Sequence, residues 1–237
     1  MAMRLVGPVY LVGGQDFHRV YVDWPANDAN VYLVDTGDTF VMVDCGCGDS
    51  FAGILQNVEE MDFEVRDISH VLLTHAHFPH AAAVDAAQKM VKLQVLASRE
   101  CADAVRSGDL RTATFAYHRE FQRCEGQVGV LEDGQSITVG AVTLTAIALP
   151  GHSPDCMGYQ MVADKRHILF CGDVVRSPLL PSWRDRFGYD AQAYEKSLLK
   201  LLETPLDVLY PGHGPMCLSH GRVWVEEELR RVRSLPL

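Results

Sequence analysis

The sequence predicts a layered domain of the α/β (α+β) class, in which mixed β-sheets pack against helices. Strand-like runs come first as a hairpin and then alternate with helical patterns along the chain. Neither an internal repeat nor a low-complexity stretch interrupts this order. The chain has 237 residues, of which 48% are hydrophobic and 22% charged, and these values are ordinary for one globular domain. We therefore expect residues 1–237 to form a single domain.

The first strand-like runs form a predicted hairpin. Residues 31–35 (VYLVD) and 39–44 (TFVMVD) are β-rich and are separated by a Thr-Gly-Asp turn. The Asp-Ser pair at 49–50 then offers a cap for a helix over about 51–60, whose apolar residues fall on one face. The later elements are strand-like runs at 68–73, 93–97, 142–149, 157–163, 167–171 and 206–210, and helical patterns near 80–90, 98–106, 190–202 and 222–234.

Three further segments are expected to surround a binding site. Residues 13–29 and 174–189 are rich in glycine, proline, aspartate and aromatic side chains, and they are long for loops without secondary structure. Loops of this length are often lids or binding loops. Together with residues 107–130, they are where we expect substrate specificity to be determined.

The charge balance limits the kind of partner. The chain has 21 lysines and arginines against 31 aspartates and glutamates, and its formal net charge is −10. This charge disfavours long contacts with a phosphate backbone, so no nucleic-acid partner is expected. No apolar run approaches the ~18 residues of a membrane-spanning helix, so no membrane partner is expected either. A small-molecule substrate is the expected partner, and a homo-oligomer is compatible with the sequence.

The cysteines and the N-terminus predict a cytoplasmic protein. The seven cysteines are odd in number and form no CxxC…CxxC zinc framework, which is typical of free, buried thiols in a reducing compartment. The first residues, MAMRLVGPVYLVGG, are broken by Pro8 and lack a small-x-small cleavage site. A signal peptide is therefore not expected.

Four strand-like runs end in residues that can bind a metal ion. In sheets flanked by helices, ligand sites gather at one end of the strands, so these residues are expected to share one cleft. A lone histidine is usually a satisfied core or surface residue, but five histidines and one aspartate with the same placement argue against that interpretation. Imidazole and carboxylate ligands suit zinc, iron or manganese better than calcium or magnesium. The candidate ligands are His75, His77 and His80 in the run THAHFPH, His152 in PGHS, Asp173 after Gly172, and His213 in PGHG.

The spacing within the first motif suits metal binding. Residues i and i+2 of an extended chain point the same way, so His75 and His77 can bind one ion. Pro79 favours a bend into the first turn of a helix, so His80 can point to a neighbouring position. Asp173 has two oxygens and can bridge two ions.

Taken together, these motifs resemble the metallo-β-lactamase superfamily, in particular its glyoxalase II and lactonase-like hydrolase branch. The resemblance runs from about residue 30 to residue 215. It implies a four-layer αββα sandwich of two mixed sheets flanked by helices, with the metals at one edge. It further implies a first metal site of His75, His77 and His152, and a second site of His80 and His213 with Asp173 bridging.

Two further positions are compared with the family pattern. Asp44 matches a strand-ending Asp-x-Gly, which implies a carboxylate that orients a ligand histidine; the alternative is an aspartate that only begins a turn. Pro79 departs from the family's HxHxDH motif, because proline stands where the motif has an aspartate and offers no ligand atom. Three interpretations stay open: a dinuclear site with an extra water, a mononuclear site, or a fold that has lost its activity.

The leading functional hypothesis is a metal-dependent hydrolase of a small ester-type substrate, which is a thioester, a lactone or a related acyl compound. One or two transition-metal ions per chain would activate a hydroxide and polarise the carbonyl, with no separate protein nucleophile. Zinc is the first expectation, followed by iron or manganese. One alternative is a mononuclear iron oxygenase resembling the persulfide dioxygenases. The other is a metal-binding protein without catalytic activity that serves binding or regulation.

Overall fold

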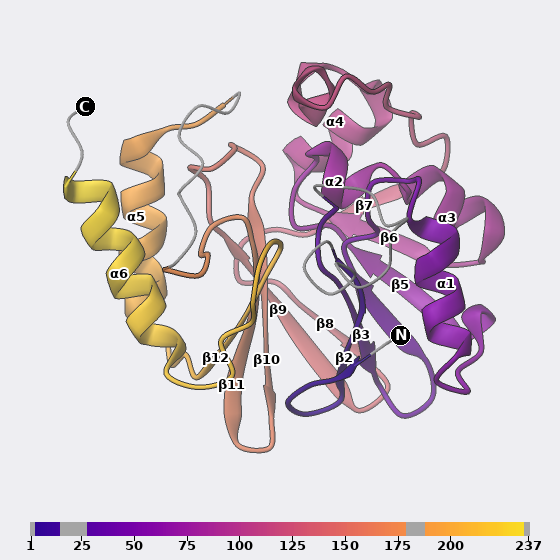
Figure 1. The fold of residues 1–237 in the computed structure, drawn as a ribbon, viewed down its shortest axis with the longest axis horizontal. Coiled ribbons are helices and arrows are strands. Elements are labelled where there is room, and N and C mark those ends of the chain that lie inside the picture. The colour runs from indigo at the N-terminus through magenta and orange to yellow at the C-terminus, as the bar shows by residue number, and fades with distance from the viewer. Residues whose placement is uncertain (1–2, 15–27, 179–187, 235–237) are drawn as a thin grey trace.

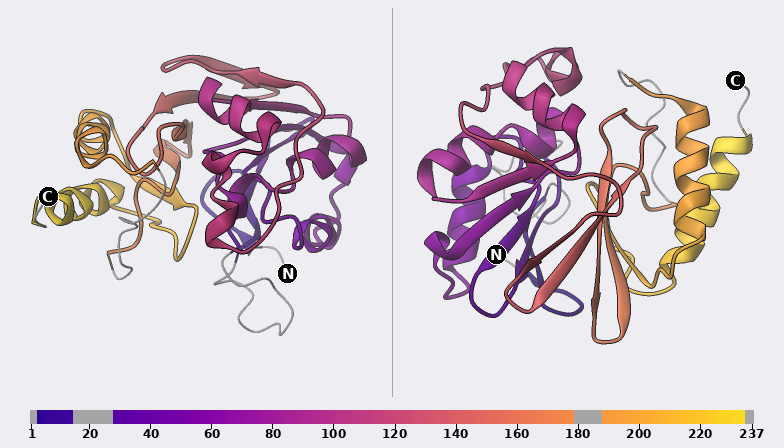
Figure 2. Two further views of the ribbon diagram at one scale, coloured as in Figure 1. Left: turned by 90° about the horizontal axis from the view of Figure 1, so that it is seen from above. Right: turned by 180° about the vertical axis from the view of Figure 1, so that it is seen from behind.

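Two β-sheets pack face to face, and helices cover the outer side of each sheet (Figures 1 and 2). The structure is a computed structural model that describes residues 3–14, 28–178 and 188–234. The predicted four-layer αββα architecture with two mixed sheets is therefore confirmed. Most of the two expected binding loops, at 15–27 and 179–187, lies outside the described residues.

The first sheet has seven strands in sequence order. Strands β1 to β4 are antiparallel to their neighbours, and the predicted hairpin is the pair β3–β4, in which Asp35 lies opposite Phe40. Strands β4 to β7 are parallel, and the connections between them contain the helices of this half. The strands are β1 (Met3–Arg4), β2 (Val9–Gly13), β3 (Val31–Asp35), β4 (Phe40–Val43), β5 (Ile68–Leu72), β6 (Gln94–Ala97) and β7 (Val128–Val130); the helices are α1 (Phe51–Glu59), α2 (Phe78–Ala81), α3 (Val84–Met90) and α4 (Arg99–Ser107).

The second sheet has five strands in the order β12-β11-β10-β9-β8. Neighbours from β8 to β11 are antiparallel, whereas β11 and β12 are parallel. Helices α5 and α6 lie on its outer face (Figure 1). The elements are β8 (Ser136–Val139), β9 (Val142–Ala148), β10 (Met157–Ala163), β11 (Arg166–Gly172), β12 (Val208–Pro211), α5 (Ala191–Leu202) and α6 (Gly221–Ser234), and three short 3-10 helices are η1 (Val65–Asp67), η2 (Leu110–Thr112) and η3 (Thr114–Ala116).

Four strands have no counterpart in the elements expected from the sequence: β1, β2, β7 and β8. They have between two and five residues, and β7 lies at the end of residues 107–130, where we expected substrate specificity to be determined. Runs this short show little periodicity of their own, and pairing with a neighbouring strand determines their conformation. None of the described helices has the length and apolar character needed to cross a bilayer.

The core lies between the two sheets and under the helices on each side. Alternate residues of β3 show this division, because Tyr32 and Val34 face the second sheet whereas Val31 and Leu33 face the helices. The Tyr32 ring lies 5.1 Å from the ring of Tyr210 in β12, measured between centroids. This packing joins the two halves and brings the loops that follow β5, β9, β11 and β12 to one edge.

Candidate metal centre

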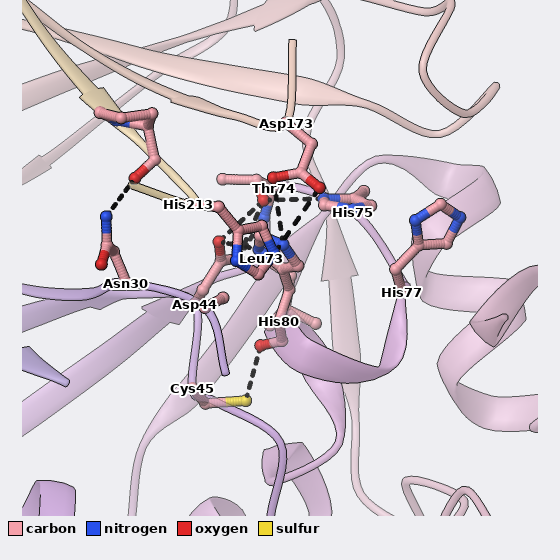
Figure 3. Close-up of polar contacts among 12 residues, drawn as sticks. Asn30, Asp44, Cys45, Leu73, Thr74, His75, His77, His80, Asp173 and His213 are labelled. Carbon is pink, nitrogen blue, oxygen red and sulfur yellow. Dashed lines mark hydrogen bonds and ion pairs between the residues drawn. The ribbon is translucent and has the colours of Figure 1, made fainter. Parts of the chain in front are cut away.

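The six predicted ligand residues lie together at this edge, and five of them are seen in Figure 3. Each follows the end of a strand, as the sequence indicated: one segment follows β5, and single residues follow β9, β11 and β12. All six side chains are buried, with at most 8% of any residue exposed. The residues are His75, His77, His80, His152, Asp173 and His213.

The first cluster consists of His75, His77 and His152. One candidate ligand atom from each residue lies within 4.8 Å of the other two. Within this cluster His152 Nε2 lies 3.0 Å from His77 Nδ1. This is the set that the family resemblance implied for a first metal ion, and its atoms are close enough to share one.

The second cluster consists of His75, His80 and Asp173, again with ligand atoms within 4.8 Å of one another. His80 Nε2 lies 3.4 Å from Asp173 Oδ1. His213, which the resemblance implied for this site, lies slightly further out, with its Nε2 3.8 Å from Asp173 Oδ2. Asp173 Oδ2 is also 3.5 Å from His152 Nε2, so its two oxygens face different clusters.

Among the described residues, three buried atoms of the second cluster have no hydrogen-bond partner: His75 Nε2, His80 Nε2 and Asp173 Oδ1. Buried polar atoms are satisfied in the great majority of cases, and those that are not need an explanation. Here the three atoms converge on one region, and their chemistry is that of transition-metal ligands. The clusters are therefore consistent with transition-metal binding.

Asp44 lies behind His80. Its Oδ2 is 2.7 Å from His80 Nδ1, which leaves Nε2 directed toward Asp173. Thr74 fixes the carboxylate, because its backbone N–H donates to Oδ1 at 2.8 Å and its hydroxyl donates to Oδ2 at 2.8 Å. Such outer contacts orient the ring and define which nitrogen is available to a metal.

The two carboxylates control the charge of His80. Burial lowers the pKa of His80, but Asp44 and Asp173 outweigh burial and raise this pKa to about 10. Burial raises the pKa of Asp173, but the neighbouring imidazoles of His213 and His80 outweigh it and hold this pKa well below its usual value. Without a metal, a proton on His80 thus neutralises part of the carboxylate charge, and a metal ion at Nε2 would replace that proton.

Three other histidines of the site, His75, His152 and His213, are neutral near pH 7. Burial, with the neighbouring histidines, lowers the pKa of His75 well below its ordinary value. Burial also lowers the pKa of His152 to about 3 and that of His213 to about 4. Each therefore has a nitrogen lone pair available to a metal.

The neutral imidazoles predict acid sensitivity of the metal-free protein. The pKa of an unperturbed histidine is 6.5, above the folded values of about 3 at His152 and about 4 at His213. The stability that these groups contribute is therefore fully present above pH 6.5 and is lost as the pH falls through the folded values. His80 does not oppose this trend, because its raised pKa makes its contribution fully present below pH 6.5.

We expect the free energy of unfolding of chelator-treated protein to fall between pH 6.5 and about 5, where most carboxylates of the unfolded chain are still ionised. Urea denaturation at closely spaced pH values measures this fall. The variant His213→Gln should show a shallower fall than the control His220→Asn, which changes an exposed histidine. A free energy of unfolding that stays constant over this range would contradict the prediction.

Helix α5 holds two of the ligand loops. Ser197 donates a hydrogen bond to the carbonyl of Pro150 at 2.6 Å, and Tyr194 donates one to the carbonyl of Val174, next to Asp173. Gly151 has φ +144°, and a Cβ there would collide with the backbone of Tyr194. Glycine before His152 therefore allows the loop to lie directly against the helix.

The first sheet holds the loop of His213. The side-chain amide of Asn30, which is labelled in Figure 3, donates to the carbonyls of Pro211 at 3.0 Å and Gly214 at 2.9 Å. The Tyr32 hydroxyl also donates to the carbonyl of Pro211, at 2.7 Å. Sequence reasoning did not identify Asn30 or Tyr194, because their partners are distant in the sequence and no motif marks them. Their burial could not be inferred from local spacing.

Comparison with known proteins agrees with this geometry. The family model described as the metallo-beta-lactamase superfamily matches residues 24–213. The lactamase-like protein aptB of Emericella nidulans is 30% identical over 191 residues, which are 78% of this chain and 50% of that protein. The thioesterase pkgB of the same organism is 29% identical over 80% of this chain and 47% of its own length. The chain thus spans about half the length of the curated relatives it matches.

Solved structures share the fold. A B3 metallo-beta-lactamase with an active-site glutamic acid superposes with a TM-score of 0.78 at 25% identity, over 98% of this chain and 88% of that one. A subclass B3 metallo-beta-lactamase of Bradyrhizobium japonicum superposes with a TM-score of 0.75 at 23% identity, over 99% of this chain and 90% of that one. At this level of identity the second match concerns the fold alone.

Proposed function

The chain belongs to the metallo-beta-lactamase superfamily, and from this we propose that it is a metal-dependent hydrolase whose substrate is a thioester. The observation that carries the proposal is the pair of buried clusters at the strand ends, with three unsatisfied ligand atoms. Thioesters are favoured over other esters because two relatives carry that activity in their names, the thioesterase pkgB and the atrochrysone carboxyl ACP thioesterase of Aspergillus fumigatus. The second of these is 26% identical over 85% of this chain and 55% of its own length.

A transition-metal ion at these clusters would lower the pKa of a water molecule toward neutrality and polarise the substrate carbonyl. The chain's own part is to present ligand atoms in fixed positions. His75 and His152 offer neutral imidazoles, His77 adds a third ring to the first cluster, and Asp173 supplies negative charge close to both clusters. Asp44 keeps the His80 ring oriented.

The cysteines near the centre do not offer a competing nucleophile. Cys45, Cys156 and Cys171 are completely buried, and burial raises the pKa of each thiol above its ordinary value. Burial raises the pKa of Cys47 to about 12. Because the thiolate is the reactive form, these groups are poor nucleophiles near neutral pH.

The number of metal ions depends on His75, which belongs to both clusters. Its Nδ1 lies 3.1 Å from the hydroxyl of Thr74, so only Nε2 is available, and one nitrogen binds one ion. If His75 completes the first cluster, a second ion must be bound by His80, Asp173 and His213. We propose this arrangement, with zinc as the first candidate metal and with iron or manganese as alternatives. Pro79, at the start of α2, contributes no ligand atom to it.

The test is elemental analysis of protein purified without added metal, followed by thioester hydrolysis. We expect one or two zinc ions per chain and release of free thiol from an acyl thioester of coenzyme A or N-acetylcysteamine. Chelation should abolish the release and metal should restore it. The variant His77→Asn should be inactive, whereas His220→Asn, which changes an exposed histidine, should retain full activity.

Two results would replace the proposal with an alternative. About one iron per chain and oxygen uptake with a persulfide, without thioester hydrolysis, would indicate an oxygenase. Metal binding without turnover of thioesters, lactones or other esters would indicate a protein that only binds its ligand.

A further inference from the structure

The geometry points to Asp155 as a positioning residue that fixes the first cluster by joining its two ligand loops. Asp155 is not itself in either cluster, and it lies three residues after His152. The inference rests on the proposed metal-dependent function, and it concerns how the chain presents His75, His77 and His152 to a metal ion.

The Asp155 carboxylate contacts both loops. Its Oδ2 accepts a hydrogen bond from the backbone N–H of Ala76 at 2.7 Å, and Ala76 is the residue between His75 and His77. Its Oδ1 accepts a hydrogen bond from the hydroxyl of Ser153 at 2.6 Å. Ser153 directly follows His152 in the chain. One side chain therefore joins the two loops that supply all three histidines.

The rest of Asp155 is equally fixed. Its backbone carbonyl accepts a hydrogen bond at 2.8 Å from Ser98, the residue that caps the N-terminus of α4. Asp155 is only 2% exposed, and burial raises the pKa of its carboxyl group. Burying a carboxylate is unfavourable unless hydrogen bonds compensate, so these bonds account for its presence here.

Two other hydrogen bonds between these segments reach the two residues just before His75. The backbone N–H of Met157 donates to the carbonyl of Thr74 at 2.8 Å, and the hydroxyl of Tyr159 donates to the carbonyl of Leu73 at 2.7 Å. Both bonds fix the residues that follow the end of β5. The segment from His75 to His77 is fixed by Asp155. The hydrogen bond that Asp155 accepts from Ala76 instead fixes the residue between His75 and His77.

The variant Asp155→Ala removes both bonds, and we expect it to weaken metal binding at the first cluster by ~10–100-fold, the range typical of lost outer contacts. The second cluster should change little, because Asp44 and Thr74 hold His80 independently. The variant Asp155→Asn is the conservative replacement. Its oxygen can accept from Ala76, and its NH2 group can donate to Ser153, whose hydroxyl then turns toward Cys156 Sγ, 3.1 Å away. We expect Asp155→Asn to restore most of the affinity.

The experiment is a cobalt titration of metal-free protein, read from the cobalt absorption bands, with a chelator competing for the metal. Tyr159→Phe is the matched control, because it removes a buried hydrogen bond from the same region without touching the ligand segment. Asp155→Ala should lower cobalt affinity in one class of sites, and Tyr159→Phe should lower thermal stability while leaving cobalt affinity unchanged. If Asp155→Ala does not fold, Ser153→Ala, which removes one of the two bonds, takes its place.

Two results would overturn the inference. Unchanged cobalt affinity in Asp155→Ala, or equal loss in Asp155→Ala and Asp155→Asn, would show that these hydrogen bonds do not position the ligands. Either result leaves the proposed function standing if the wild-type protein binds metal and hydrolyses thioesters. A wild-type protein that binds no cobalt would instead refute the proposed function itself.

Discussion

Replacing His75 with alanine is expected to remove metal from the first cluster, to weaken metal binding at the second cluster and to abolish hydrolysis, whereas replacing His77 removes metal from the first cluster alone. His75 offers Nε2, its one available nitrogen, to the first cluster, and its ring also packs against the ring of His80, with centroids 4.1 Å apart. With His75 gone, the first cluster retains two of its three candidate ligands, and His80 in the second cluster loses a packing partner. At the first cluster the loss of affinity should exceed the ~10–100-fold that changing an outer contact typically costs.

Elemental analysis of the two variants, purified in parallel with wild type, measures this difference. His220→Asn serves as the control for changing a histidine elsewhere, since His220 is exposed and has φ +60°, a conformation that asparagine tolerates. Circular dichroism should show all variants folded, because the metal-free His75 side chain makes one hydrogen-bond contact, to Thr74. Equal metal content in His75→Ala and His77→Ala would show that His75 does not support metal binding at the second cluster.

The sequence was sufficient to predict that the candidate ligands lie together, because each carries a local mark. His152, Asp173 and His213 each follow a glycine at the end of a strand-like run, and the structure brings these strand ends to one edge. The hairpin and the alternation of strands and helices likewise depend on residues near one another in the chain. Periodicity and turn chemistry are properties of such short segments, and they can be detected without knowing the fold.

The residues that hold the ligands could not be predicted in this way. Asn30 bonds to a carbonyl 181 residues away, and Asp155 bonds to an amide 79 residues away. A single buried polar residue with a distant partner leaves no periodic pattern, and its role appears only after the two sheets have packed. Asp44 is an exception because it ends a strand within a motif, although it bonds to His80 36 residues away.

The second large effect is expected from Gly212→Ala, which should disrupt the second cluster and leave the first in place. A Cβ at Gly212 would collide with Cε1 of the His80 ring and would lie 2.8 Å from Asp173 Oδ1. Both are candidate ligands that Asp44, Thr74 and the end of β11 hold in place, so neither can retreat without losing its contacts.

Overpacking a buried site typically costs ~1–3 kcal/mol of folding free energy, and here the displaced groups are the candidate ligands themselves. Gly158→Ala is the matched control, because a Cβ at Gly158 would lie 2.9 Å from Leu149 Cδ1, inside the second sheet and away from the ligands. Both variants should lower the urea midpoint of the metal-free protein, but only Gly212→Ala should lose one equivalent of bound metal. Equal metal content in the two variants would mean that the close approach of the His213 loop to His80 and Asp173 serves packing alone, and the second cluster would then need another explanation for its unsatisfied atoms.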